Sequence, residues 1–160
     1  MEKVLTSQTK IRFQDCDPFN HLNNSRYIDY MINAREDHLV DNYELDIFTL
    51  AKTTGRAWVV AMNQIAYISP AVTMETVIIE SQLISYSQKS LGVEIRMWNK
   101  AKRKLRAVLW SKFIHINLTT SLPVDHNEEF MQFVESVHLP VEQSQFEERI
   151  QYLKGLKTVE

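Results

Sequence analysis

Residues 15–30 read D-C-D-P-F-N-H-L-N-N-S-R-Y-I-D-Y and join the first strand-like segment of the chain to its longest helical one. The segment before them, residues 9–17, alternates between two faces as a β-strand does. One predicted face consists of Ile11, Phe13, Asp15 and Asp17. Pro18 ends this strand because proline cannot donate to the hydrogen-bond ladder of a sheet. A short loop must therefore carry the chain from Asp17 to the helix.

Residues 24–43 have the spacing of a long α-helix. Apolar and aromatic side chains recur every three or four residues, at Tyr27, Ile28, Met31, Ile32, Ala34, His38 and Leu39. Asn24 or Ser25 can cap the N-terminus of this helix. The stripe is wider than the seam of a coiled coil, so we expect a sheet to wrap around the helix. Residues 44–55 predict a short helix or turn that Gly55 ends.

From residue 56 onward the chain has the pattern of long strands joined by short connections. The expected strands are residues 57–68, 75–86, 91–98 and 105–117. Connections this short indicate antiparallel hairpins. Polar amphipathic segments follow at about residues 127–137 and 143–156. We predict an α+β fold in which a long central helix packs against a curved antiparallel sheet of about five strands, with peripheral C-terminal helices.

The composition is that of an ordinary globular protein, with 44% hydrophobic and 24% charged residues among 160. This length predicts a single domain over residues 1–160, with its core at about 5–125 and a helical extension at about 126–160. A net charge of −2 gives no general attraction to phosphate backbones, so we expect no nucleic-acid partner. One cysteine and three scattered glycines exclude a disulfide framework, a dinucleotide fingerprint and a P-loop. With no signal peptide and no stretch near the roughly 20 apolar residues that span a bilayer, we expect a cytoplasmic protein without membrane association.

The concentration of polar side chains before the long helix suggests a site for acyl transfer. Asp17 ends the predicted inward row of the first strand, where partial desolvation makes a carboxylate more reactive. The helix that follows offers unpaired amides and the positive end of its dipole, which suit a developing oxyanion. The alternative is that Asp15 or Asp17 only caps the loop and the helix.

The same stretch resembles the signature D-x-D-x-x-G-H-V-N-N-x-x-Y of hot-dog-fold thioesterases, the 4-hydroxybenzoyl-CoA thioesterase-like family. Weaker likenesses follow at Ala34-Arg35, at residues 64–71 (the "Y-x-x-P" strand end of that family) and at Lys89-Ser90. The resemblance covers about residues 5–125, and its order of elements agrees with the periodicity. It implies a hot-dog fold in which the sheet wraps around the central helix.

The resemblance further implies hydrolysis of an acyl-CoA thioester, with Asp17 as nucleophile or general base and no cofactor or metal. The backbone amide of Asn24 would hold the thioester carbonyl, and Lys89 and Ser90 stand where the family has a basic residue and a serine that meet the substrate. One departure is Asn20, which replaces the usual glycine, although asparagine tolerates left-handed backbone better than most residues. A plant acyl-carrier-protein thioesterase motif, D-x-N-x-H-V-N-N-x-x-Y, is also similar to this stretch.

The other polar residues of the motif have two interpretations each. His21 can polarise the thioester or contact substrate, or it can bond to the local backbone. Asn23 and Asn24 can contact substrate, or they can shape and cap the turn. Tyr27 is a further candidate for substrate contact, although one turn into the helix it is placed to pack in the core.

Metal and thiol chemistry fit the motif less well. An EF-hand would need an oxygen ligand, a glycine and a glutamate where Phe19, Asn20 and Arg26 stand. A metal held by Asp15, Asp17 and His21 lacks a further ligand. Strand alternation directs Cys16 away from Asp17, which weakens a dyad of Cys16 with His21.

The basic residues at 100–106 lie in a predicted hairpin turn, where solvated charge is usual. They, or Lys89, could meet the phosphates of CoA. The edges of long strands also need to be covered. Hot-dog proteins resemble one another in pairing the sheets of two subunits, which then share the active site. We therefore expect a homodimer or a dimer of dimers. A non-catalytic acyl-CoA or acyl-carrier-protein binding module and an acyl-carrier-protein thioesterase remain alternatives. The histidine motif of hot-dog hydratases is absent, and no helix-turn-helix segment is expected.

Overall fold

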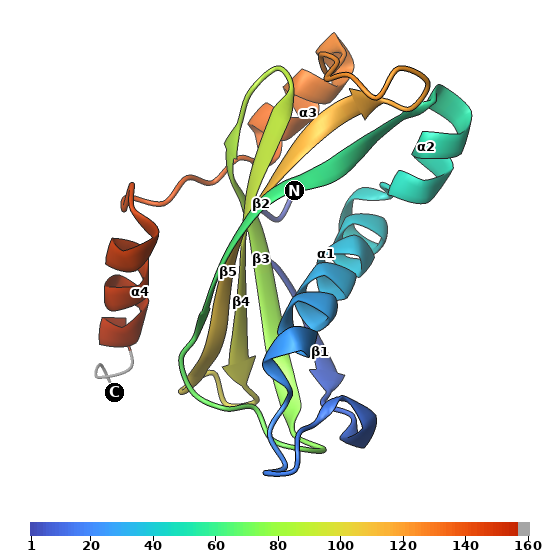
Figure 1. Cartoon of the computed structure of the whole chain (residues 1–160). Coiled ribbons are helices and arrows are strands. Elements are labelled where there is room, and N and C mark those ends of the chain that lie inside the picture. The colour runs from blue at the N-terminus through green and yellow to red at the C-terminus, as the bar shows by residue number, and fades with distance from the viewer. Residues whose placement is uncertain (157–160) are drawn as a thin grey trace.

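The computed structural model describes residues 1–156 and contains one five-stranded antiparallel sheet in the order β1-β3-β4-β5-β2 (Figure 1). The strands are β1 (Leu5–Lys10), β2 (Arg56–Tyr67), β3 (Thr76–Tyr86), β4 (Ser90–Asn99) and β5 (Leu105–Asn117). The helices are α1 (Tyr27–Tyr43), α2 (Ile47–Thr54), α3 (Glu128–Val137) and α4 (Phe146–Gly155). Short 3₁₀ turns, η1 (Phe13–Asp15) and η2 (Asn24–Arg26), precede α1. The predicted α+β architecture with a five-stranded antiparallel sheet is confirmed.

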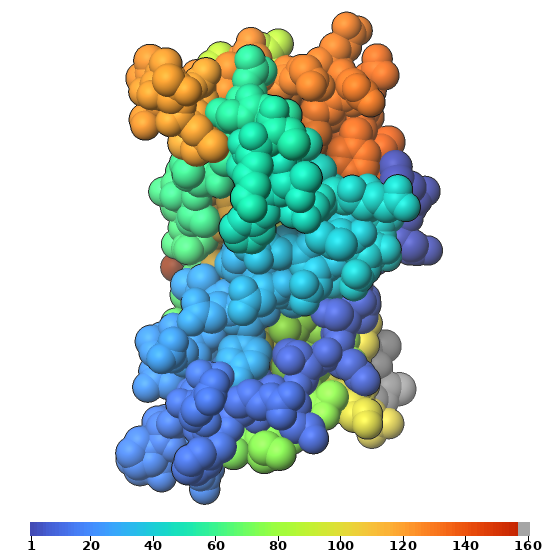
Figure 2. All heavy atoms as spheres, turned by 90° about the vertical axis from the view of Figure 1, so that its right-hand side faces the viewer, coloured from blue at the N-terminus to red at the C-terminus, as the bar shows by residue number. Residues whose placement is uncertain are grey.

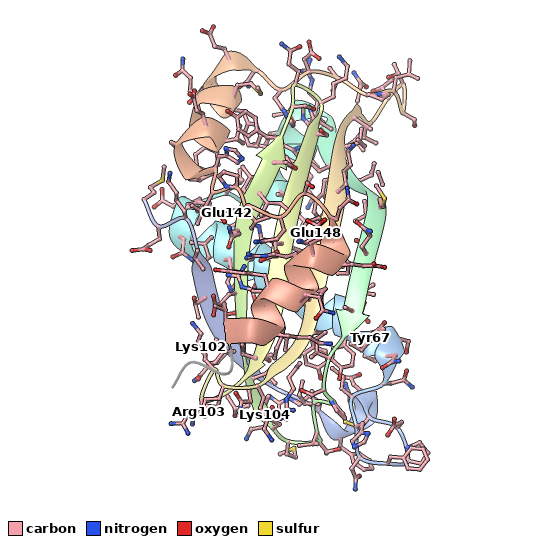
Figure 3. All side chains as sticks on the ribbon, turned by 90° about the vertical axis from the view of Figure 1, so that its left-hand side faces the viewer. Tyr67, Lys102, Arg103, Lys104, Glu142 and Glu148 are labelled. Carbon is pink, nitrogen blue, oxygen red and sulfur yellow. The ribbon has the colours of Figure 1, made fainter. Side chains whose placement is uncertain are left out.

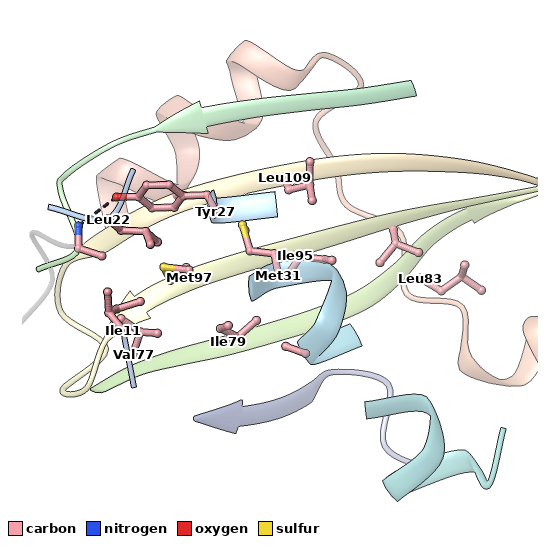
Figure 4. Packing of buried hydrophobic residues seen from close by; sticks show 14 of the residues in the cluster. Ile11, Leu22, Tyr27, Met31, Val77, Ile79, Leu83, Ile95, Met97 and Leu109 are labelled. Atoms are coloured by element: carbon pink, nitrogen blue, oxygen red, sulfur yellow. Dashed lines mark hydrogen bonds between the residues drawn. The ribbon is translucent and has the colours of Figure 1, made fainter. Parts of the chain in front are cut away.

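Helix α1 packs against the concave face of the sheet, as its wide apolar stripe predicted (Figures 1 and 4). Tyr27 and Met31 are buried from this helix, and they belong to one core with Ile95 and Met97 of β4. The helix begins at Tyr27 rather than Asn24, because residues 24–26 form the tighter η2 turn. Gly55 ends α2 with a φ of 70°, a left-handed conformation that glycine adopts without steric cost.

The predicted strand over residues 9–17 is wrong. Strand β1 ends at Lys10, and the amide of Asp15 donates to the carbonyl of Arg12, which closes the η1 turn. Ile11 is fully buried but Phe13 is 75% exposed, so these two side chains do not share a face. The alternation of residues 11–17 was accidental, because a turn with i→i+3 bonds does not keep the two-residue period of a strand.

The convex face of the sheet is covered by α4, which lies across its middle strands (Figure 3). Glu94 of β4 is fully buried there and accepts hydrogen bonds from Arg149 of α4, at 2.8 Å to each of its two oxygens. Trp110 donates to the same carboxylate at 2.7 Å, and Arg96 also pairs with it. The alternating Glu94 and Arg96 of β4 therefore do not face solvent. They form the polar contact between the sheet and the C-terminal helix.

Candidate active site

The loop between η1 and η2 is held in one conformation by the carboxylate of Asp17. Its Oδ1 accepts from the amides of Phe19 at 2.9 Å and His21 at 3.0 Å, and the Asp17 amide donates to the His21 carbonyl at 2.8 Å. Asn20 lies at the tip with a φ of 63°, the left-handed region in which asparagine is well tolerated. Asn20 therefore takes a backbone conformation typical of glycine, and the departure from the family motif does not disturb the turn.

Neighbouring segments fix this loop on the body of the protein. The Asp15 carboxylate accepts from the Tyr30 hydroxyl at 2.6 Å, which ties the loop to α1. On its other side the Leu22 amide donates to the Ala71 carbonyl, and the Thr73 amide donates to the Asn20 carbonyl. Asp15 is thus a structural carboxylate, whereas Asp17 belongs to the loop itself.

Asp17, His21, Asn24 and Tyr27 are brought together in one cavity. The remaining lining residues are Leu22, Tyr67, Ile68, Ser69 and Pro70. The site therefore lies between the loop, the start of α1 and the segment that follows β2. Oδ1 of Asp17 is occupied by the loop amides, whereas Oδ2 makes no hydrogen bond to another residue within residues 1–156.

The Asn24 amide opens η2 and takes no part in the recorded hydrogen bonds of the loop within residues 1–156. The Tyr67 hydroxyl donates to the Asn24 carbonyl at 3.1 Å, which holds the backbone of residue 24 against the end of β2. A fixed amide at the start of a helix can donate to an oxyanion. Asp17 and Asn24 line one cavity, and a carboxylate near a backbone amide is a combination suited to attack on a carbonyl carbon.

Tyr27 forms the floor of this cavity. It is 2% exposed, and its hydroxyl accepts from the Ala71 amide at 3.0 Å (Figure 4). Burial raises the pKa of the Tyr27 phenol, so the hydroxyl stays protonated and neutral. The ring also meets Tyr67 edge to face, with centroids 5.2 Å apart. Tyr27 thus positions the wall that carries residues 69–71.

Asn23 does not line the cavity. Its side-chain oxygen accepts from the Ser25 amide at 3.0 Å and from the Ser25 hydroxyl at 2.9 Å, so it caps η2. Of its two interpretations, the structure shows the capping role.

Lys89, in the β3–β4 turn, and Ser90, the first residue of β4, lie at the other end of the sheet. The carbonyl of Lys89 accepts from His115 on β5, whereas Tyr67 beside Asp17 pairs with Ala107 on the same strand. These two points of β5 are roughly 26 Å apart at about 3.3 Å per residue. Lys89 is half exposed and ion-paired with Asp125, and Ser90 bonds to Ser87. Within one chain they cannot join the Asp17 cavity, so the expectation of a single site holding all these residues is not met by one protomer.

Tyr67 and Ser69 are cavity residues that the sequence did not single out. They lie in residues 64–71, the segment that resembles the "Y-x-x-P" strand end of the family and to which no functional role was assigned. The pattern could have identified Tyr67, because it is the last residue of the strand and lies three residues before Pro70, beside the loop.

Within residues 1–156 no group of three or more His, Cys, Asp or Glu side chains is placed to hold a metal ion. None of the helices in this range is long and apolar enough to cross a membrane.

Residues 11–134 match the family model of the thioesterase-like superfamily. The long-chain acyl-CoA thioesterase FadM of Escherichia coli K12 is 34% identical over 86 residues, an alignment that spans 54% of this chain and 63% of FadM, less than two thirds of its length. Among solved structures, the probable thioesterase YbaW of Escherichia coli has a TM-score of 0.71 at 27% identity over 84% of this chain and 99% of YbaW. SAV2348 of Staphylococcus aureus, solved in complex with CoA, has a TM-score of 0.77 at 13% identity and covers 91% and 92% of the two chains. The arrangement of helix and sheet is the hot-dog fold that the sequence predicted.

Proposed function

Because this chain belongs to the thioesterase-like superfamily, we propose that it hydrolyses an acyl-CoA thioester to a free acid and CoA. The observation that carries the proposal is that Asp17 shares a cavity with Asn24, the first residue of the η2 turn that precedes α1. A binding module has no need of a carboxylate with one oxygen held by two amides and the other left for reaction. The acyl-CoA thioesterase FadM and the CoA complex of SAV2348 support CoA as the carrier.

In the proposed reaction the thioester carbonyl carbon lies against Oδ2 of Asp17. The carboxylate attacks it to give an acyl anhydride that water then opens, or it takes a proton from the water that attacks. In both routes the carbonyl oxygen becomes negative and accepts from the Asn24 amide. The thiolate of CoA leaves and takes up a proton. His21, in the same cavity, contacts the substrate or polarises its carbonyl.

We further propose that two chains pair through β2. This strand lies at the edge of the sheet with one side unpaired, and its exposed apolar side chains include Val59, Val60 and Met62. An edge of this kind is a template for pairing with another strand. A twofold axis makes two β2 strands run antiparallel, so the Tyr67 end of one chain lies beside the Arg56 end of the other.

Such a dimer would bring distant residues of two chains together. The Asp17 loop is at the Tyr67 end of β2, whereas Lys89 is at the Arg56 end of the sheet. Lys89 of the partner subunit would then lie on the same side as the Asp17 cavity, where it could meet the phosphates of CoA. The pairing therefore explains why one chain separates residues that the family motif brings to one site.

A hydrolysis screen tests the proposed activity. Acyl-CoA thioesters from two to sixteen carbons and aromatic acyl-CoA thioesters are incubated with the protein, and released CoA thiol is measured. We expect thiol release with at least one class. Binding of acyl-CoA without release would identify a binding module, and release from acyl-carrier-protein alone would refute CoA as the carrier.

The molar mass in solution tests the pairing. We expect a dimer or a dimer of dimers by light scattering. Met62→Lys places a charge on the β2 edge and should give monomers that have lost thioesterase activity. A wild-type monomer with full activity would overturn the shared site.

A further inference from the structure

A second cavity lies between the C-terminal half of α1, helix α3 and the concave face of the sheet. Figure 2 shows α1 and α2 covering this side of the molecule, with α3 at one end. Its walls are mostly apolar and include Leu39, Trp58, Leu83, Phe113, Phe133 and Val134. The cavity is separate from the Asp17 cavity, and no residue is common to the two linings.

Arg35 of α1 is a buried cation in this apolar wall. It is 8% exposed, and its one side-chain hydrogen bond within residues 1–156 goes from NH1 to the Ser81 hydroxyl at 3.0 Å. No carboxylate pairs with it in this part of the chain. Burial lowers the pKa of its guanidinium to about 10, and Tyr43 is the other group that acts on it. Arg35 therefore stays charged at neutral pH, and Ser81 is the one protein acceptor for its five donors within residues 1–156.

The one neighbour that accepts from Arg35 within residues 1–156, Ser81, is itself held by a further hydrogen bond. Ser81 receives the Arg35 hydrogen bond and lies 2.7 Å from Nδ1 of His38, while Nε2 of His38 lies 2.8 Å from the Ser7 hydroxyl. The two serines are neutral and burial lowers the pKa of His38, so none of these groups neutralises the guanidinium. Glu36, the other charged residue of the wall, is half-buried and does not figure among the groups that act on Arg35.

A buried cation beside an empty apolar space is costly unless an anion pairs with it. We propose that this cavity binds the acyl group of the substrate and that Arg35 pairs with a carboxylate at the far end of that group. The preferred substrate is then an ω-carboxyacyl thioester, the monothioester of a dicarboxylic acid. This inference rests on the proposed function and names the acyl group that the function leaves open.

The proposed β2 pairing provides the route between the two cavities. Trp58 lines the apolar cavity and lies two residues from Arg56, the end of β2 that the twofold brings beside the Asp17 loop of the other chain. An acyl group whose thioester is held at Asp17 therefore points toward the apolar cavity of the partner subunit. The far end of that acyl group would reach the guanidinium.

The test compares substrates of equal chain length that differ only at the far end. Adipoyl-CoA and suberoyl-CoA are compared with hexanoyl-CoA and octanoyl-CoA on wild type, Arg35→Lys and Arg35→Met. We expect wild type to prefer the carboxylated member by at least tenfold in kcat/KM, as a charge-assisted bond in an apolar site provides. Arg35→Lys should keep part of the preference, and Arg35→Met should bring the ratio to one or below.

A second measurement reports binding without catalysis. Octanoate and 1-octanol have the same chain, and octanoate should raise the melting temperature of wild type more than 1-octanol does, because bound ligand stabilises the fold. Arg35→Met should lose that difference.

If wild type cleaves no thioester but octanoate still acts through Arg35, the proposed function fails and the cavity assignment stands. If wild type cleaves both members of each pair equally and Arg35→Met changes neither ratio nor melting difference, the carboxylate assignment is overturned. Should Arg35→Met not fold, wild type and Arg35→Lys decide the outcome.

Discussion

Protonation of His38 should destabilise the fold as the pH falls below neutrality. This side chain is 1% exposed between α1 and the sheet, and both of its ring nitrogens contact serine hydroxyls. Burial, and next the charge of Arg35, lower the pKa of His38 from 6.5 to about 4. The native state therefore keeps the imidazole neutral over a range in which the unfolded chain binds a proton.

The size and direction of the effect follow from this difference in pKa. Above pH 6.5 neither state binds the proton, and His38 costs nothing. Between pH 6.5 and 4 the unfolded state is stabilised by protonation, so the free energy of unfolding falls by up to about 1.4 kcal/mol per pH unit. From pH 7.5 to 5.0 the loss due to His38 amounts to about 2 kcal/mol. His115 and His126 also have pKa values lowered by burial and add to the same trend.

Urea denaturation of wild type and His38→Gln at a series of pH values isolates this contribution. Glutamine keeps a hydrogen-bonding side chain but does not titrate, and the other histidines are present in both proteins. We expect the free energy of unfolding of wild type to fall by about 2 kcal/mol more than that of His38→Gln between pH 7.5 and 5.0. Parallel pH curves for the two proteins would refute a neutral, buried His38.

Two further changes test the C-terminal helix and the partner contact. Glu94→Gln removes the buried carboxylate that pairs with Arg149, leaves Arg96 paired with Glu80, and should lower the free energy of unfolding in urea by about 3 kcal/mol; a loss below about 1 kcal/mol would mean that the network does not hold α4. Lys89→Ala should raise KM for acyl-CoA several-fold and leave kcat and the melting temperature nearly unchanged, since its ion pair with Asp125 is half exposed. An unchanged KM would place the CoA phosphates elsewhere, with the basic turn at residues 100–106 as the next candidate.

Most of the sheet could be predicted from the sequence because its strands are long and its connections short. β5 runs over the predicted residues 105–117, β3 begins one residue later than predicted, and β2 and β4 differ from prediction by one residue at each end. The first strand failed because residues 11–17 are too few to distinguish a strand from a turn by alternation. Asp17 was placed near the helix start for partly the wrong reason, since a loop and not a strand face presents it.

The sequence could predict the part of the candidate site that consists of residues close together in the chain. Asp17, His21, Asn24 and Tyr27 lie within eleven residues of sequence, so one loop and one helix start bring them together. Arg35 and Glu94 could not be recognised as buried charges, because their burial depends on the packing of α3 and α4 on opposite faces of the sheet. The distance of Lys89 from Asp17 depends on strand register, which the sequence pattern does not define.

The kcat of Asp17→Asn on the best acyl-CoA of the screen tests the proposed chemistry most directly. Asparagine keeps the size and one oxygen that can accept from the loop amides, but it removes the nucleophile and base. We expect kcat to fall by about 10²- to 10⁴-fold with little change in KM. Asp15→Asn is the matched control two residues earlier, and it should cost less because Asp15 bonds to Tyr30 outside the cavity. Near-full activity of Asp17→Asn, with activity abolished in His21→Ala, would contradict a carboxylate mechanism.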